Sequence, residues 1–208
     1  MQSYRPHAVR LRADWTYPLL WLALAAPPLR SWLESSMALH MLVQLPLLAW
    51  IGYCAGRMWT RSHSLNQLQS FNAGGATGIL IASFAMLLWM LPRPLDLARL
   101  DASIDTLKFV SVPMAGVAIA LSWHRLPAIA RAVVHLEVIA TLLRFGWGYL
   151  AAEQRLCLSY LAEDQRVTGI ILVVLGALYA IAVSWKAVFG VPIYAFFARA
   201  DDSRAAAP

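Results

Sequence analysis

The chain has 208 residues, of which 60% are hydrophobic and only 13% are charged, and its mean hydropathy is +0.60. This balance excludes an ordinary soluble domain and indicates a polytopic membrane protein. The net charge is +6, but the Lys and Arg residues are spread over every loop instead of forming one stripe, which argues against nucleic-acid binding. Because a spanning helix needs about 20 apolar residues, about five to seven spans fill the chain and leave no room for a separate soluble domain.

The N-terminal part combines a basic leader, residues 1–14, with a first apolar stretch, residues 15–33, which is interrupted by Pro27 and Pro28. Two interpretations of this stretch are open. Basic residues before a short apolar core that ends in "ALAA" also fit a cleavable signal peptide. A second apolar run follows the proline pair at once, so we favour a first membrane span.

Further apolar stretches follow in chain order, and each is separated from the next by a polar or charged connector. They cover residues 34–56, 74–92, 109–123, 128–152 and 167–189, and residues 191–208 form a short amphipathic tail. The sequence therefore predicts an all-α fold, a polytopic transmembrane helix bundle of about six spans within residues 15–190.

An even number of spans places both termini on one side, and the loop charges indicate which side. Lys and Arg on the terminal side are Arg5, Arg10, Arg12, Arg57, Arg61, Arg125, Arg131, Lys186, Arg199 and Arg204. Those on the other side are Arg30, Arg93, Arg99, Lys108, Arg155 and Arg166. The excess on the terminal side predicts cytoplasmic N and C termini. Most acidic residues fall on the outer side, which makes that face the more acidic one.

The second stretch carries an unusual set of side chains for a membrane span. Met37, His40, Met41 and Gln44 recur at i, i+3, i+4 and i+7, so they share one helix face in the outer half of the membrane. Counted along their own predicted spans at about 1.5 Å per residue, Met86, Met90 and Met114 also lie in the outer half of the membrane.

Thioethers together with an imidazole suit Cu(I), and an acidic mouth attracts cations. We therefore predict a copper site that faces outward, with ligands drawn from Met37, His40, Met41, Met86, Met90 and Met114. Packing is the open alternative, because methionine fills irregular gaps in helix bundles. Copper is the only cofactor predicted, and Gln44 is interpreted as an interhelical hydrogen-bonding residue.

Two charged residues within the fifth stretch suggest a different function. Glu137 and Arg144 lie seven residues apart, hence on one helix face, and we expect both to face the bundle interior. They could be structural countercharges, or they could line the path of a small-solute or ion transporter or channel.

A haem-bearing accessory subunit of a respiratory complex is a further alternative. His40 and His135 miss a common depth by about 13 Å, so only a His–Met pair remains for haem. No catalytic or nucleotide-binding motif occurs in the chain, so we do not expect an enzyme.

The stretch "ALHMLVQLPLL", residues 38–48, resembles the "HM-x-QH-LLL" signature of the CtaG-like cytochrome oxidase assembly family through His40, Met41 and Gln44. The segments "WMLPRPLDLARLDASIDTLKFVSVPMAG" and "RLCLSYLAEDQRVTG" are similar to a related group of uncharacterised bacterial polytopic membrane proteins. The resemblance implies a multi-pass protein of the bacterial inner membrane that handles copper and assists assembly of a respiratory oxidase. It also implies a membrane-embedded respiratory complex as partner, in addition to the lipid bilayer.

Overall fold

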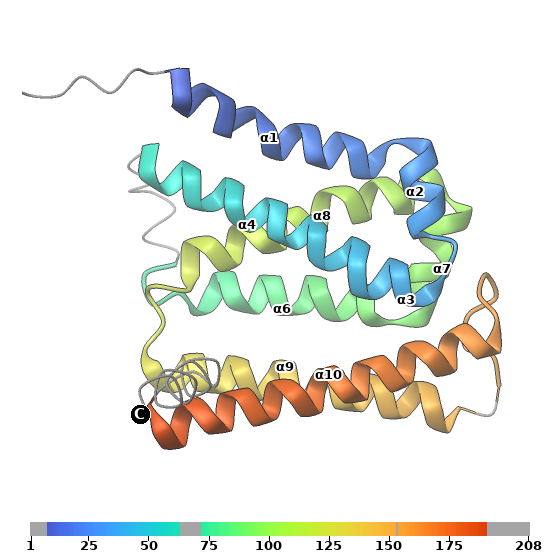
Figure 1. Cartoon of the computed structure of the whole chain (residues 1–208). Coiled ribbons are helices and arrows are strands. Elements are labelled where there is room, and N and C mark those ends of the chain that lie inside the picture. Colours follow the sequence, from blue (N-terminus) through green and yellow to red (C-terminus); the bar gives the residue numbers. More distant parts are fainter. Residues whose placement is uncertain (1–7, 63–71, 153, 191–208) are drawn as a thin grey trace, which may run out of the picture.

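The structure is a computed structural model that describes residues 8–62, 72–152 and 154–190. Every regular element in these ranges is a helix, which confirms the predicted all-α fold. The longer helices alternate in direction along the chain, so α1 begins and α10 ends at the same end of the bundle, on the left in Figure 1. The short elements α2, α3 and α7 lie at the opposite end, which is named the distal end below.

The N-terminal elements include two breaks in helical continuity. α1 (Ala8–Ala25) is followed by α2 (Pro27–Leu33), and Ala26 between them is extended. Prolines occupy the first two positions of α2, where their missing N–H groups cost no helical hydrogen bond. After a turn, α3 (Met37–Leu39), η1 (His40–Gln44) and α4 (Leu45–Ser62) form one continuous rod, in which η1 is a single π-helical turn.

The remaining elements complete the bundle. They are α6 (Ala76–Met90), α7 (Pro92–Leu100), α8 (Ala102–Ser122), α9 (Ala128–Ala151) and α10 (Ala162–Phe189). Pro92 begins α7, and the chain bends by 73° between α6 and α7. Asp101 caps α8, because its Oδ1 accepts a hydrogen bond of 2.7 Å from the backbone N–H of Ser103. The charged segment 93–108, predicted as a loop, is therefore mostly helical.

Three helical segments in the described ranges are long and apolar enough to cross a membrane: Met37–Trp59, Ala102–Ser122 and Ala162–Phe189. The bent pair α6 and α7 makes a fourth if it counts as one span. The apolar part of α1, Trp15–Ala25, is shorter than a span, and α9 does not meet the same criterion. These helices support a membrane protein, whereas six spans and cytoplasmic termini stay predictions. The tail 191–208 and residues 1–7 of the leader lie outside the described residues.

The centre of the bundle is the close crossing of α4 and α8. Gly52 and Gly116 lie at this crossing, and a Cβ atom on either would collide with the backbone of the facing helix. α1 is attached to the same pair, because Trp21 Nε1 donates a 2.9 Å hydrogen bond to the carbonyl of Phe109. That carbonyl lacks its helical donor because the residue four positions later is Pro113.

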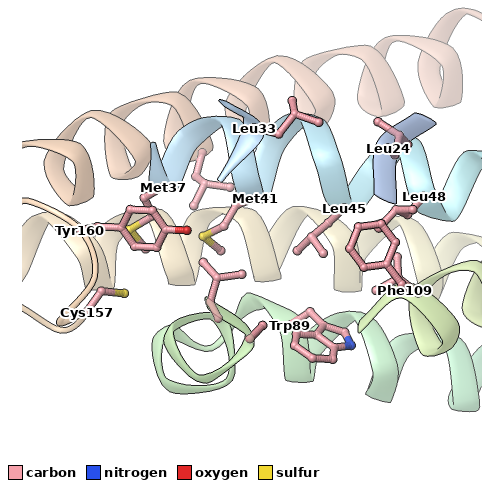
Figure 2. Packing of buried hydrophobic residues seen from close by; sticks show 14 of the residues in the cluster. Leu24, Leu33, Met37, Met41, Leu45, Leu48, Trp89, Phe109, Cys157 and Tyr160 are labelled. Carbon is pink, nitrogen blue, oxygen red and sulfur yellow. The ribbon is translucent and has the colours of Figure 1, made fainter. Parts of the chain in front are cut away.

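The helices divide into two packing groups. α6 packs on α8, α9 pairs with α10, and α6 and α9 contact each other only sparsely. Figure 2 shows the buried apolar cluster, with Leu48, Phe109 and Trp89 toward one end and Met37, Tyr160 and Cys157 toward the other. The cluster also includes Tyr149 of α9 and Leu172 of α10, so it joins the two groups. The polar residues described next lie beside the second end.

Candidate functional site

The predicted stripe on the second apolar stretch is fully buried. Met37, His40, Met41 and Gln44 each have 0% exposed surface, which confirms that they share an inward face. His40, Met41 and Gln44 belong to the π-helical turn η1. Such turns widen a helix by one residue, and they occur frequently at functional sites.

Lys108 is the centre of the site, although the sequence pattern predicts a loop at this position. It lies on α8 with 0% exposed surface, which is rare for a lysine unless it is paired. Its Nζ is 2.6 Å from Glu34 Oε1 and 2.9 Å from Asp105 Oδ1. The same ammonium is 3.1 Å from His40 Nε2 and donates a long hydrogen bond of 3.5 Å to Gln44 Oε1.

Arg30 completes the ionic part of the site from α2. Its Nη1 is 2.9 Å from Asp105 Oδ2 and its Nε is 3.4 Å from Glu34 Oε1. The two carboxylate side chains are 6% exposed, whereas Arg30 is 34% exposed and connects the site to the surface. Two cations therefore face two carboxylates, and the ionic group carries no net charge when both pairs are ionised.

One oxygen of this group is incompletely satisfied. Asp105 Oδ1 lies close to the Lys108 ammonium but accepts no hydrogen bond of good geometry. Burying an oxygen in this state costs free energy. The hydrogen-bonding capacity of the ionic group is thus not fully satisfied.

The hydrogen bonds of His40 determine its tautomer. A lysine ammonium has donors only, so the Nε2 atom that faces Lys108 must be the acceptor. The single N–H of a neutral imidazole is then on Nδ1, which donates to the hydroxyl oxygen of Tyr160 at 2.7 Å. Both nitrogens of His40 are engaged, so a metal ion could bind the ring only by displacing Lys108 or Tyr160.

The loop 152–161 brings Tyr160 to His40. Asp96 holds this loop, because its two oxygens accept hydrogen bonds of 2.6 and 3.1 Å from the backbone N–H groups of Leu158 and Ser159. The guanidinium of Arg99 lies 5.1 Å from the centre of the Tyr160 ring. Burial raises the pKa of Tyr160 above its ordinary value, and Arg99 partly offsets this effect.

Cys157 lies in the same loop, with 1% of its surface exposed. Burial raises the pKa of its thiol to about 12, and Asp96 adds to the effect. Its sulfur makes a weak contact of 3.8 Å with the carbonyl of Pro92. Figure 2 shows Cys157 with Met37, Met41 and Tyr160 at one end of the packing cluster.

The other predicted methionines differ in their surroundings. Met86 and Met90 on α6 are partly buried and pack against the same core as Met37 and Met41. Tyr149 joins two of them, because its hydroxyl donates to the carbonyl of Met90 at 2.6 Å and lies 3.7 Å from Met41 Sδ. Met114 is 63% exposed, so it does not face this core.

The expectation that Glu137 and Arg144 face the bundle interior is wrong. Both are on α9 and both are exposed, and Glu137 accepts a 3.4 Å hydrogen bond from Thr141. Their spacing gives a common helix face, but that face is exposed and is not part of the packed core; Glu137 borders an open cavity between α6 and α9. The third predicted polar residue, Gln44, donates a 3.3 Å hydrogen bond to Glu34.

Comparisons of the chain with family models, with curated proteins and with solved structures give no match.

Proposed function

We propose that this protein is a multi-pass inner-membrane transporter or channel for protons or a small ion, with Lys108, His40 and Tyr160 as its proton-handling centre. The observation that carries the proposal is the fully buried Lys108, which touches two carboxylates and an imidazole and lies on a helix long and apolar enough to cross a membrane. Ionisable residues inside membrane spans are costly, and they commonly mark ion pathways and proton relays.

The contacts of His40 suit a relay. Transfer of a proton from Lys108 Nζ to His40 Nε2, together with release of the Nδ1 proton to the Tyr160 oxygen, leaves a neutral imidazole in its other tautomer. Tyr160 then passes its own hydroxyl proton toward the surface beside Arg99. The transfers from Lys108 to His40 and from His40 to Tyr160 follow existing hydrogen bonds, and the last step releases the Tyr160 hydroxyl proton to water. The cycle closes when Lys108 takes up a new proton and the imidazole returns to its first tautomer.

Access to the centre is one-sided. Arg30 and Arg99 reach the surface at the distal end, whereas Leu45, Leu48 and Val112 are 0% exposed and form an apolar layer on the other side. Transport therefore requires that this layer open or that a proton cross it transiently. We accordingly propose that the arrangement is the closed, outward-facing state of an alternating-access protein.

The proposed topology has six crossings, formed by α1, α4, the α6–α7 pair, α8, α9 and α10, with both termini cytoplasmic. The alternating directions of these helices support it (Figure 1). The distal end, with the ionic group of Arg30, Glu34, Asp105 and Lys108, then faces the periplasm. This topology keeps the orientation that the loop charges predict.

Proton flux into liposomes tests the proposal. The purified chain is reconstituted with a pH-sensitive dye inside, and a potassium diffusion potential drives uptake. Wild type is expected to acidify the lumen faster than empty liposomes, and His40→Gln is expected to lose at least nine-tenths of that excess. Glutamine can still hydrogen-bond to Lys108 and Tyr160, but it cannot carry a proton.

Arg144→Gln is the matched control, because it also changes a polar residue to glutamine but lies on the exposed face of α9. It should retain wild-type flux. Equal flux from wild type and His40→Gln would exclude the relay. Loss of flux only in Arg144→Gln would indicate that the ion path runs along the exposed face of α9 that carries Arg144.

A second candidate, copper handling in support of oxidase assembly, rests on a separate observation. Met37, Met41 and Cys157 are soft donors with 0–1% exposed surface in one buried cluster, and Met86 and Met90 pack against it. Thiolate and thioether ligands favour Cu(I). The proposed ligand set thus replaces His40 and Met114 with Cys157.

Titration with Cu(I) against a chromogenic chelator tests this candidate. The Met37→Leu, Met41→Leu double variant should lose one bound copper, and Met114→Leu should keep it. Identical binding curves for all three proteins would refute the site. An absorption spectrum of the same sample tests the haem alternative, which requires a Soret band.

A further inference from the structure

A second polar site lies in the seam between the two packing groups. An open cavity of about 330 Å³ is lined by residues of α6, α8, α9 and α10, and a neighbouring hollow of about 470 Å³ continues along α6 and α9. Ile79, Ser83, Val134 and Glu137 line both spaces, so the two are contiguous. Sites for small organic ligands have volumes in this range.

The cavity lining is mainly apolar, with a few polar groups in one region. His135 Nδ1 and the Tyr179 hydroxyl are 2.6 Å apart, and Trp123 meets the imidazole edge to face at 5.5 Å. Within the described part of the chain, Nε2 of His135 has no hydrogen-bond partner. The Glu137 carboxyl lies two residues further on the same helix and bonds only to Thr141 among the described residues.

The depth of these groups limits the kind of occupant. This depth follows from the proposed topology, in which α9 crosses the membrane and its midpoint lies at the midplane. Glu137 is about 4 Å from that midpoint along the helix axis. Phospholipid head groups lie about 15 Å from the membrane centre, so they do not reach this level. The occupant must therefore be a lipid-soluble molecule whose small polar group can reside at the midplane.

The opening of the seam agrees with entry from the bilayer. Leu80 and Val133 line the outer hollow and are 58% and 59% exposed, and Phe84 beside them is 73% exposed. Among the residues that the structure describes, Glu137 is the only charged one that lines either space. A neutral ligand with an apolar tail can thus enter sideways between α6 and α9.

We propose that this seam binds a lipid-soluble hydroquinone. One hydroxyl donates to the Glu137 carboxyl and the other to Nε2 of His135, while the ring packs beside Trp123 and the tail occupies the outer hollow. His135 Nε2 is an acceptor in the tautomer whose Nδ1–H donates to the Tyr179 hydroxyl oxygen. Two such acceptors in a mainly apolar cavity favour a neutral molecule with two donors on a flat ring. The inference concerns binding only, and it is independent of the proton relay at Lys108.

Binding of a decyl-substituted benzohydroquinone to the full chain in phosphatidylcholine nanodiscs tests the proposal. The probe is kept reduced, and its dissociation constant is measured by equilibrium dialysis against empty nanodiscs. His135→Leu and Glu137→Leu are each expected to weaken binding at least tenfold, because a buried ligand hydroxyl loses its acceptor. Arg144→Leu, an exposed charge on the same helix, should leave the constant unchanged.

The dimethyl ether of the probe distinguishes a hydroquinone from a hydrocarbon chain. It keeps the ring and the tail but has no donors, so its binding should be at least tenfold weaker. Equal binding of the probe and its ether would show a groove for any acyl chain and would overturn the proposal. Light scattering that gives a dimer which binds no probe would also overturn it, since a second copy would then cover the seam. Circular dichroism confirms that each variant is folded.

Discussion

Removal of the buried ammonium in Lys108→Met should destabilise the fold substantially. Methionine fits the volume of the lysine stem but leaves Glu34 and Asp105 without the cation that lies 2.6 and 2.9 Å away. Loss of one partner from a buried ion pair typically costs about 3–5 kcal/mol. Arg30 still faces both carboxylates and is partly exposed, so we expect the lower end of this range, about 3 kcal/mol.

The assay is reversible unfolding in mixed micelles with increasing sodium dodecyl sulfate, followed by circular dichroism. Arg144→Met is the control, because it removes an exposed cation and should change the unfolding free energy by less than about 0.5 kcal/mol. Adding Glu34→Gln to Lys108→Met should recover part of the loss, since it removes one uncompensated carboxylate. A Lys108→Met protein as stable as wild type would refute the energetic reasoning about this ionic group.

Three further predictions follow from other parts of the fold. Tyr160→Phe leaves the buried Nδ1 of His40 without its 2.7 Å partner and should cost about 1–3 kcal/mol in the same assay; no loss would contradict the buried hydrogen bond between His40 and Tyr160. Gly116→Ala places a Cβ against the backbone of α4 and should cost about 3 kcal/mol, whereas Gly148→Ala has open space and should be neutral or stabilising by up to about 1 kcal/mol. The pKa of Cys157 is raised to about 12, so its thiol is protonated at pH 8. Mass spectrometry should therefore find Cys157 unmodified by N-ethylmaleimide until the protein unfolds or the pH approaches that pKa. Rapid labelling of the folded protein at pH 8 would contradict this prediction.

Much of the helical fold was predictable, because long apolar runs and proline positions are local signals. The shared face of Met37, His40, Met41 and Gln44 was also predictable, since helical spacing determines which side chains lie together. The exposed position of Glu137 and Arg144 was not, because equal spacing gives a common face without saying which way that face points.

The ionic centre at Lys108 was missed for a physical reason. Lys108 and Glu34 are 74 residues apart, and their opposite charges neutralise each other only once α8 lies beside the C-terminal end of α2. In the sequence, Lys108 follows a run of charged residues and looks like the end of a loop. Two local signals were present, the i, i+4 pair Arg30–Glu34 and the i, i+3 pair Asp105–Lys108, and both are ion pairs in the fold.

The position of the loop that carries Tyr160 and Cys157 also depends on a contact between distant segments. Its position depends on Asp96, which binds two backbone N–H groups more than sixty residues away in the sequence. No local pattern in residues 152–161 indicates that this loop covers a histidine. Such contacts between distant segments decide the site, whereas local patterns decide the helices.

The most direct measurement of the central claim is the initial rate of proton uptake by liposomes that contain wild type, His40→Gln or Arg144→Gln at equal protein density. The relay through Lys108, His40 and Tyr160 predicts uptake well above empty liposomes for wild type and Arg144→Gln, and a rate near that of empty liposomes for His40→Gln. Uptake by His40→Gln at the wild-type rate, with all three proteins folded, would contradict it.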